Sequence, residues 1–121
     1  MSYSNGNMLI MTRFLTFAGT QTPKQLDFTS LLSAMAPPAV TARGVLGMFN
    51  YDATGILKNI TVPVLIIAAN NDRLTKAEAS FIMNRNIPAS QITTLNPAGH
   101  MGLIERHEEV NSAVSRFLRQ Q

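Results

Sequence analysis

One continuous apolar run stands out in the pattern of hydrophobic and polar positions. It reads Val62-Pro63-Val64-Leu65-Ile66-Ile67-Ala68-Ala69 and contains no polar residue. A run without alternation predicts a strand buried on both faces, which is usual in parallel sheets covered by helices. A second strand is predicted at Gln91–Leu95, where β-rich residues alternate with polar ones.

The segment between these strands predicts a turn and a crossover helix. Asn70-Asn71-Asp72 is turn-prone, and residues 76–84 have helical spacing. Thr75, with Glu78 three residues later, predicts a capping box at the start of this helix. If the helix crosses over the sheet, the two strands are parallel.

The end of the chain predicts a loop and one last helix. Residues 96–102 read as the loop, and the helix runs from Glu105 to Arg119, with acids at its start and arginines at its end. This arrangement suits the helix dipole, so Glu105 is assigned to the helix start rather than to chemistry.

The first half predicts three helices and no strand. They span residues 8–18, residues from Thr22 as N-cap up to Pro37, and residues 38–49, whose buried positions are predicted as Val40, Val45, Leu46, Met48 and Phe49. Residues 1–7 are expected to fray. The composition is compatible both with a plain helical core and with a cap over a pocket.

These elements predict two units, a helical cap-like segment at 1–54 and a core segment at 55–121. The order of the core segment is β-α-β-α, which is an α/β arrangement with two parallel strands. Two strands do not make a stable sheet alone, so further strands are expected from an upstream segment or a partner.

Composition and charge narrow the functional classes. The chain has 121 residues, 45% of them hydrophobic, and it has no cysteine, which excludes disulfides and thiolate metal sites. Its ten Lys and Arg are scattered, which argues against nucleic-acid binding, and no apolar run approaches a membrane span. We expect a cytoplasmic protein with no metal and no cofactor.

Two side chains are candidates for chemistry. Asp72 and His100 both lie just beyond the predicted carboxyl end of a strand, where α/β sheets bind their ligands. The alternatives are a turn aspartate satisfied by local backbone donors and a loop histidine packed under the helices. Gly99 and Gly102 beside the histidine predict unusual backbone angles.

Residues 55–118 resemble the carboxyl-terminal segment of α/β-hydrolase fold proteins of the cap-bearing serine-hydrolase type. The resemblance rests on Leu57 and Ile60 before the apolar strand, Asp72 after it, Ala98-Gly99-His100-Met101, Glu105, and the pairs Val110-Asn111 and Phe117-Leu118. It implies a Ser-Asp-His triad in that chain order, with Asp72 as the acid and His100 as the general base. Residues 8–50 resemble the cap.

The sequence also departs from that family's pattern. Ala69 stands where a glycine is usual, and neither G-x-S-x-G nor G-x-D-x-G occurs. The resemblance therefore implies a carboxyl-terminal fragment without the nucleophile, the oxyanion-hole donors and the first strands. Such a fragment would be inactive alone, whereas the parent enzyme would cleave an ester, amide or carbon–carbon bond in a small apolar ester-like or acyl substrate.

Two further hypotheses remain open. The chain could be a non-catalytic interaction module that pairs its open strand edge with another polypeptide or with itself. Under the fragment hypothesis the partner would instead be the missing amino-terminal half. It could also be a self-sufficient α/β domain that binds a small ligand between the helices and the sheet. No substrate-binding residue is singled out by the pattern.

Overall fold

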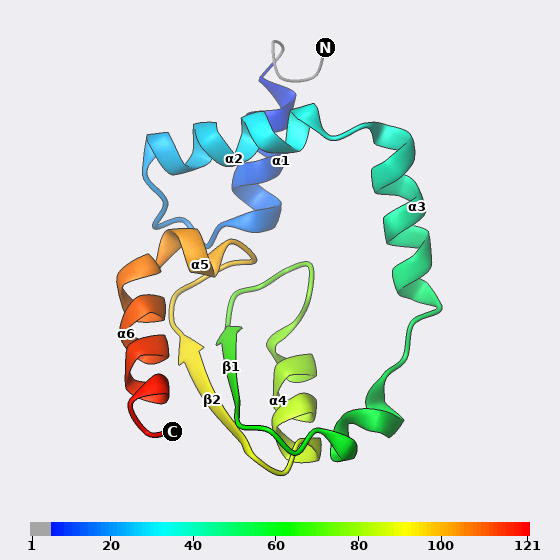
Figure 1. Cartoon of the computed structure of the whole chain (residues 1–121). Helices are drawn as coiled ribbons and strands as arrows, with labels where there is room; N and C mark the ends of the chain where they lie inside the picture. Colours follow the sequence, from blue (N-terminus) through cyan, green and yellow to red (C-terminus); the bar gives the residue numbers. More distant parts are fainter. Residues whose placement is uncertain (1–5) are drawn as a thin grey trace.

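The computed structural model describes residues 6–121 (Figure 1). Most of the end expected to fray lies outside the described residues. In chain order the elements are α1 (Asn7–Thr16), α2 (Pro23–Met35), α3 (Pro38–Phe49), the 3-10 helix η1 (Thr54–Asn59), β1 (Val64–Ala69), α4 (Ala77–Asn86), β2 (Ser90–Leu95), α5 (Gly102–Glu105) and α6 (His107–Leu118). Helices thus precede a β-α-β-α unit, as predicted.

Strands β1 and β2 form a parallel pair. Their register runs from Val64 opposite Ser90 to Ala69 opposite Leu95. In Figure 1 the two arrows point the same way and lie between α6 and α4. The prediction of two parallel strands joined by a helix is therefore confirmed.

The burial of β1 differs from the sequence prediction. Ile66 and Ala68 are buried, but the alternate positions are only half-buried, and Val62 is exposed ahead of the strand. The prediction that β1 is buried on both faces was wrong for the described residues. The sheet that they form has only two strands, so β1 has a strand neighbour on one edge only.

Helices α1 and α2 pack together at the carboxyl end of the sheet (Figure 1). The predicted start of α2 is confirmed: the Thr22 hydroxyl accepts the Gln25 N–H, and the Gln25 side chain accepts the Thr22 N–H. The Gln25 amide also donates to the Ile104 carbonyl at 2.7 Å, which joins α2 to α5.

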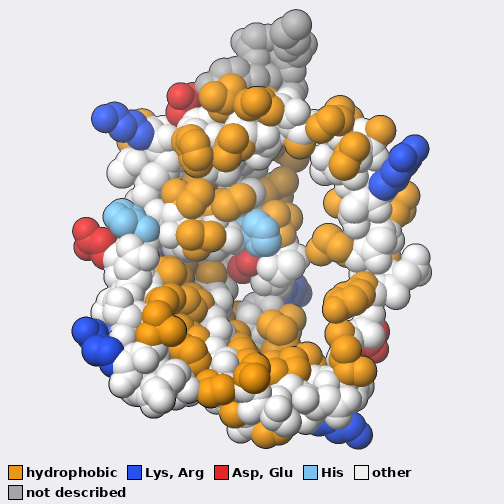
Figure 2. All heavy atoms as spheres, in the orientation of Figure 1, with side chains coloured by type: hydrophobic (Ala, Val, Ile, Leu, Met, Phe, Trp, Pro, Cys, Tyr) orange, Lys and Arg blue, Asp and Glu red, His pale blue; other side chains and the backbone are white. Residues whose placement is uncertain are grey.

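Helix α3 forms where predicted, but its predicted core does not. Val40, Val45, Leu46, Met48 and Phe49 are all exposed, and Phe49 is 81% exposed. Figure 2 shows α3 standing apart from the rest of the molecule, with openings between α3 and the other elements. Helical periodicity marked an apolar face, but no described element packs against it closely enough to bury a residue.

Two predicted helix starts are also wrong. Helix α4 begins at Ala77 with Lys76 as N-cap and has no side-chain cap, because the Thr75 hydroxyl bonds to Asp72 instead. The last helix is divided at Arg106 into α5 and α6, and Glu105 ends α5 as a buried residue.

Gly99 and Gly102 serve close packing rather than unusual backbone angles. Among the described residues, positive φ angles occur only at Gly6 and Gly19. A Cβ on Gly99 would lie 2.6 Å from the Thr16 carbonyl oxygen and 2.7 Å from the Phe17 carbonyl carbon. The loop that carries His100 can therefore press directly against the end of α1.

We predict that Gly99→Ala lowers the free energy of unfolding by about 1–3 kcal/mol, because the new methyl group overpacks backbone atoms that cannot rotate away. Gly47→Ala is the matched control. Gly47 lies inside α3, and a Cβ added there would have no atom within 4 Å. That variant should gain up to about 1 kcal/mol. Urea unfolding measures both, and an unchanged Gly99→Ala midpoint would contradict the packing argument.

Candidate functional site

The carboxyl ends of β1 and β2 deliver two loops to one edge of the sheet. The Asn70 N–H donates to the Leu95 carbonyl at 3.2 Å, and the Asn71 N–H donates to the Ala98 carbonyl at 3.0 Å. These bonds continue the strand pairing into the loops. The residues that follow, Asp72 and His100, are therefore brought side by side.

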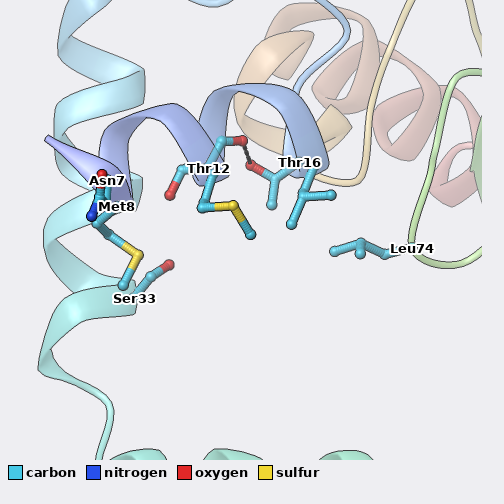
Figure 3. Close-up of a pocket in the computed structure, with 8 residues that line it drawn as sticks. Asn7, Met8, Thr12, Thr16, Ser33 and Leu74 are labelled. Carbon is cyan, nitrogen blue, oxygen red and sulfur yellow. Dashed lines mark hydrogen bonds between the residues drawn. The ribbon is translucent and has the colours of Figure 1, made fainter. Parts of the chain in front are cut away.

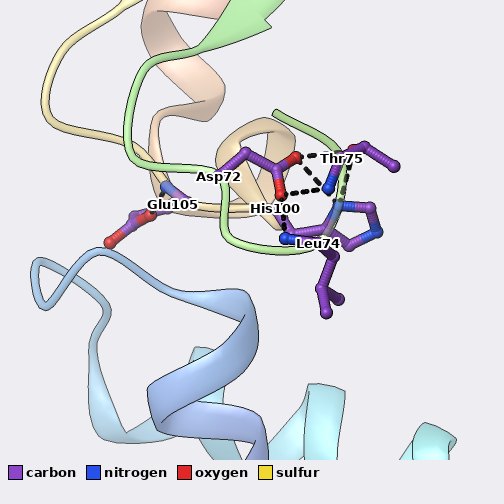
Figure 4. Close-up of polar contacts among 6 residues, drawn as sticks. Asp72, Leu74, Thr75, His100 and Glu105 are labelled. Atoms are coloured by element: carbon purple, nitrogen blue, oxygen red, sulfur yellow. Dashed lines mark hydrogen bonds and ion pairs between the residues drawn. The ribbon is translucent and has the colours of Figure 1, made fainter. Parts of the chain in front are cut away.

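Asp72 and His100 form the centre of the site (Figure 4). The His100 Nδ1 lies 2.9 Å from the Asp72 Oδ2, and the Thr75 hydroxyl donates to the same oxygen at 2.8 Å. The other carboxylate oxygen accepts the N–H groups of Leu74 and Thr75 at 2.8 and 2.9 Å. Asp72 therefore fits both of its predicted roles: it accepts hydrogen bonds from backbone donors in its own turn, and it contacts the histidine.

The hydrogen bonds of Asp72 favour its ionised form. Burial by itself raises the pKa of Asp72, but the donors from Thr75, His100 and Leu74 outweigh burial and hold this pKa below its usual value. The carboxylate is ionised at neutral pH and can only accept, so the proton of the 2.9 Å contact belongs to His100 Nδ1. Nε2 is then the ring nitrogen free to take a proton.

The two side chains differ in exposure in a way that suits proton transfer. The Asp72 side chain is 9% exposed, whereas that of His100 is 34% exposed. A shielded carboxylate keeps the imidazole oriented, and an accessible imidazole can reach a reacting group. This arrangement could act as an acid–base pair.

The sequence analysis assigned Glu105 to a helix start rather than to chemistry, but the structure places this residue beside the histidine loop. Its carboxylate is buried and accepts N–H groups from Gly99 at 2.9 Å, Ala18 at 3.0 Å and Thr20 at 3.0 Å, and the Thr20 hydroxyl at 2.7 Å. Burial opposes ionisation, but the donors, with Gly99 the strongest, hold the pKa of Glu105 below its usual value. Nothing in the pattern of residues 105–119 signalled that residues 18–20 lie beside it.

The end of α1 touches both site loops. The Arg73 guanidinium donates to the Phe14 carbonyl at 2.6 Å, next to Asp72. The Met101 N–H donates to the Thr16 carbonyl at 2.8 Å, next to His100. Residues 14–20 therefore hold the two loops from the side opposite the strands.

Two cavities adjoin the site. One of about 620 Å³ includes Asp72, Thr75 and His100 in its wall, together with the apolar side chains of Leu103 and Val110. A second, of about 330 Å³, is lined by α1, α2 and the loop after Asp72, chiefly by Met8, Met11, Leu15 and Leu74 (Figure 3). Both have apolar walls that suit a small molecule; the first borders His100, whereas the second meets the site loops at Leu74.

Residues 6–121 offer no metal site, no membrane-spanning helix and no role for the second histidine in the site. This part of the chain has no group of three or more His, Asp or Glu side chains placed to hold a metal ion. None of its helices has the length and apolar character needed to cross a membrane. His107 lies outside the site, with its Nδ1 3.4 Å from the Ile104 carbonyl.

Comparison with known proteins gives one family match. Residues 49–121 match the sequence model of an α/β-hydrolase group described as TAP-like protein. The chain is 27% identical over 95 residues to RutD of Stutzerimonas stutzeri (strain A1501), which carries the name of a carbamate hydrolase. That match covers 78% of this chain and 36% of the relative.

Solved structures agree with this match. A thermophilic esterase from Thermogutta terrifontis superposes with a TM-score of 0.81 at 26% identity, over 95% of this chain and 44% of the esterase. A serine hydrolase involved in carbazole degradation, CarC, shares the fold with a TM-score of 0.71 at 18% identity, over 95% of this chain and 47% of that protein. The chain thus has the architecture of part of an α/β-hydrolase, spanning less than half of each solved structure.

We predict that the protein loses stability as the pH falls below about 4, because the pKa values of Asp72 and Glu105 are lowered by folding. Carboxyls with lowered pKa values stabilise the fold above their unfolded pKa and lose that effect as the pH falls through the folded value. Urea unfolding between pH 6 and pH 2.5 should show a shallower pH dependence for Asp72→Asn and Glu105→Gln than for the wild type. Glu78→Gln, at an exposed position of α4, is the control and should keep the wild-type slope.

Proposed function

The chain belongs to the α/β-hydrolase family, and we propose from this premise that Asp72 and His100 are the acid and the general base of a hydrolase active site. The observation that carries the proposal is the 2.9 Å contact between His100 Nδ1 and Asp72 Oδ2, at the edge of the sheet where the two parallel strands end. Ligands of open α/β sheets bind at this edge.

In the proposed mechanism the two residues have distinct roles. Ionised Asp72 holds the Nδ1 proton of His100 and stabilises the imidazolium that forms. Nε2 takes the proton of a hydroxyl nucleophile as its oxygen attacks the substrate carbonyl carbon. The same proton then passes to the leaving group as its bond to that carbon breaks, so the imidazole returns to its starting state.

The nucleophile in this proposal comes from polypeptide outside the present sequence. The sequence contains no G-x-S-x-G, the motif that presents the serine in the family. Residues 55–121 then supply the acid and base of the core, and residues 1–54 form the cap-like segment, of which helices α1 and α2 lie at the same edge of the sheet as the site (Figure 1). We expect the present chain alone to be inactive in acyl transfer.

The proposed substrate is a small ester, amide or related acyl compound with an apolar portion. The names of the similar proteins specify ester and carbamate hydrolysis for those proteins. The apolar walls of the two cavities support an apolar portion in the substrate of this one. No metal or cofactor takes part in the proposed reaction.

A fusion protein tests this proposal. In the fusion, the present chain replaces the matching part of the Thermogutta terrifontis esterase, and hydrolysis of an activated ester is measured. Asp72→Asn and His100→Ala should each lower kcat by at least about 10³-fold, because the histidine loses its orientation or its base. His107→Ala is the matched control and should keep kcat.

Covalent labelling separates the source of the nucleophile from the role of the pair. A serine-reactive phosphonate should label the fusion only within its esterase portion and should leave the isolated chain unlabelled. Labelling within residues 1–121 would show that the chain carries its own nucleophile. An unchanged kcat in His100→Ala would contradict the proposed base.

A specific observation favours a second candidate function, an interaction module. In α3, the side chains of Leu46 and Phe49 are 64% and 81% exposed. Strands β1 and β2 each have one edge without a strand partner among the described residues. Exposed apolar faces and open strand edges are templates for association. Under this hypothesis two copies of the chain pair through these surfaces.

This alternative predicts self-association at micromolar concentration. Light scattering should give a mass above 13.2 kDa that rises with concentration. Leu46→Gln with Phe49→Gln should shift the protein toward the monomer, because the apolar contact area is lost. A wild-type chain that stays monomeric across the concentration range would argue against the module.

A further inference from the structure

Glu105 is not a member of the proposed acid–base pair, but its buried carboxylate joins two segments next to that pair. It ends α5, it is 7% exposed, and the donors to it come from two segments that are far apart in the sequence. Gly99 donates from the residue directly before His100, and Ala18 and Thr20 donate from the connection between α1 and α2. Figure 4 shows its carboxylate pointing toward this connection.

His100 is held by backbone bonds at both of its neighbours. On one side the Gly99 N–H donates to the Glu105 Oε2 at 2.9 Å, and on the other the Met101 N–H donates to the Thr16 carbonyl at 2.8 Å. Gly99 also contacts the backbone of Thr16 and Phe17 so closely that a Cβ would not fit. The backbone position of His100 is therefore set against the end of α1.

The charge of Glu105 makes these contacts strong. An ionised carboxylate that accepts several donors forms charge-assisted hydrogen bonds, which are about twice as strong as neutral ones. Glutamine at this position would turn an amide NH₂ toward N–H donors, and aspartate would be one methylene too short to reach both segments. The arrangement therefore depends on both the charge and the length of glutamate.

We propose that Glu105 is a positioning residue for His100, which couples the placement of the imidazole against Asp72 to the docking of the α1–α2 connection. The catalytic consequence rests on the proposed function, whereas the structural consequence does not. When residues 18–20 are docked on Glu105, the histidine loop is fixed and Nδ1 meets Asp72. When this docking is lost, the loop is free to move and the imidazole leaves the carboxylate.

The ring nitrogens of His100 provide the first test. Long-range ¹H–¹⁵N NMR of the full chain should show His100 with its proton on Nδ1 at neutral pH, as the bond to Asp72 requires. In Glu105→Gln the His100 signals should move to the mixed tautomer of a solvated imidazole. Glu78→Gln, at an exposed position of α4, is the control and should leave the His100 signals unchanged. His100 signals identical to those of the wild type would overturn the proposal.

A second variant decides the question if Glu105→Gln fails to fold. Thr20→Val removes one donor to Glu105, 2.7 Å away, and leaves the Gly99 contact in place. Coupling through Glu105 predicts that amide exchange of Gly99 speeds up by about tenfold, the loss expected for one hydrogen bond to a charged group. An unchanged rate at Gly99 would show that the two segments are not coupled and would overturn the proposal.

Kinetics of the esterase fusion distinguish this proposal from the proposed function. Glu105→Gln should lower kcat more than it changes KM, because a misplaced base affects the chemical step. If His100→Ala abolishes activity while Glu105→Gln keeps kcat, the positioning role fails alone. If His100→Ala keeps activity, the proposed function fails, and the NMR and exchange results still decide the coupling.

Discussion

The parallel register of β1 and β2 is the constraint on which the rest of the site depends. Because Ala69 pairs with Leu95, both strands end at the same level and their loops leave from one edge of the sheet. The bonds from Asn70 to Leu95 and from Asn71 to Ala98 extend this contact two residues beyond the end of β1. A shift of the register would separate the carboxylate of Asp72 from the imidazole of His100 without changing either residue.

Two buried or shielded carboxylates then complete the arrangement. Asp72 collects donors from its own turn and from His100, and Glu105 collects donors from Gly99 and from the α1–α2 connection. In each case hydrogen bonds outweigh the cost of burial, so the charge persists and the geometry is fixed. The sheet brings the loops together, and these carboxylates set their final positions.

The site is well packed, whereas much of the apolar surface has no packing partner among the described residues. The site loops and the end of α1 are well packed, with Phe17, Leu95 and Ala98 buried, whereas α3 buries no residue. The described residues form the carboxyl edge of a small sheet and do not supply enough partners for every apolar face. This matches a chain that spans less than half of the esterase and less than half of CarC.

Much of the fold could be predicted from sequence, because it depends on local patterns. The apolar run at 62–69, the Thr22 cap and the prolines after Met35 mark elements that the structure confirms within a few residues, and the positions of Asp72 and His100 follow from the strand ends. The burial of α3 was predicted wrongly, since periodicity identifies an apolar face without showing what covers it.

The sequence by itself determined both strands and most of the helices, but not η1 or the division of the last helix at Arg106, and it placed an acid and a histidine just after two neighbouring strands. Only the tertiary structure decided that Gly99 touches the backbone of residues 16 and 17, and that Glu105 joins residues 18–20 to the histidine loop. The physical reason is distance along the chain: periodicity and capping are local, whereas these contacts reach across as many as 87 residues.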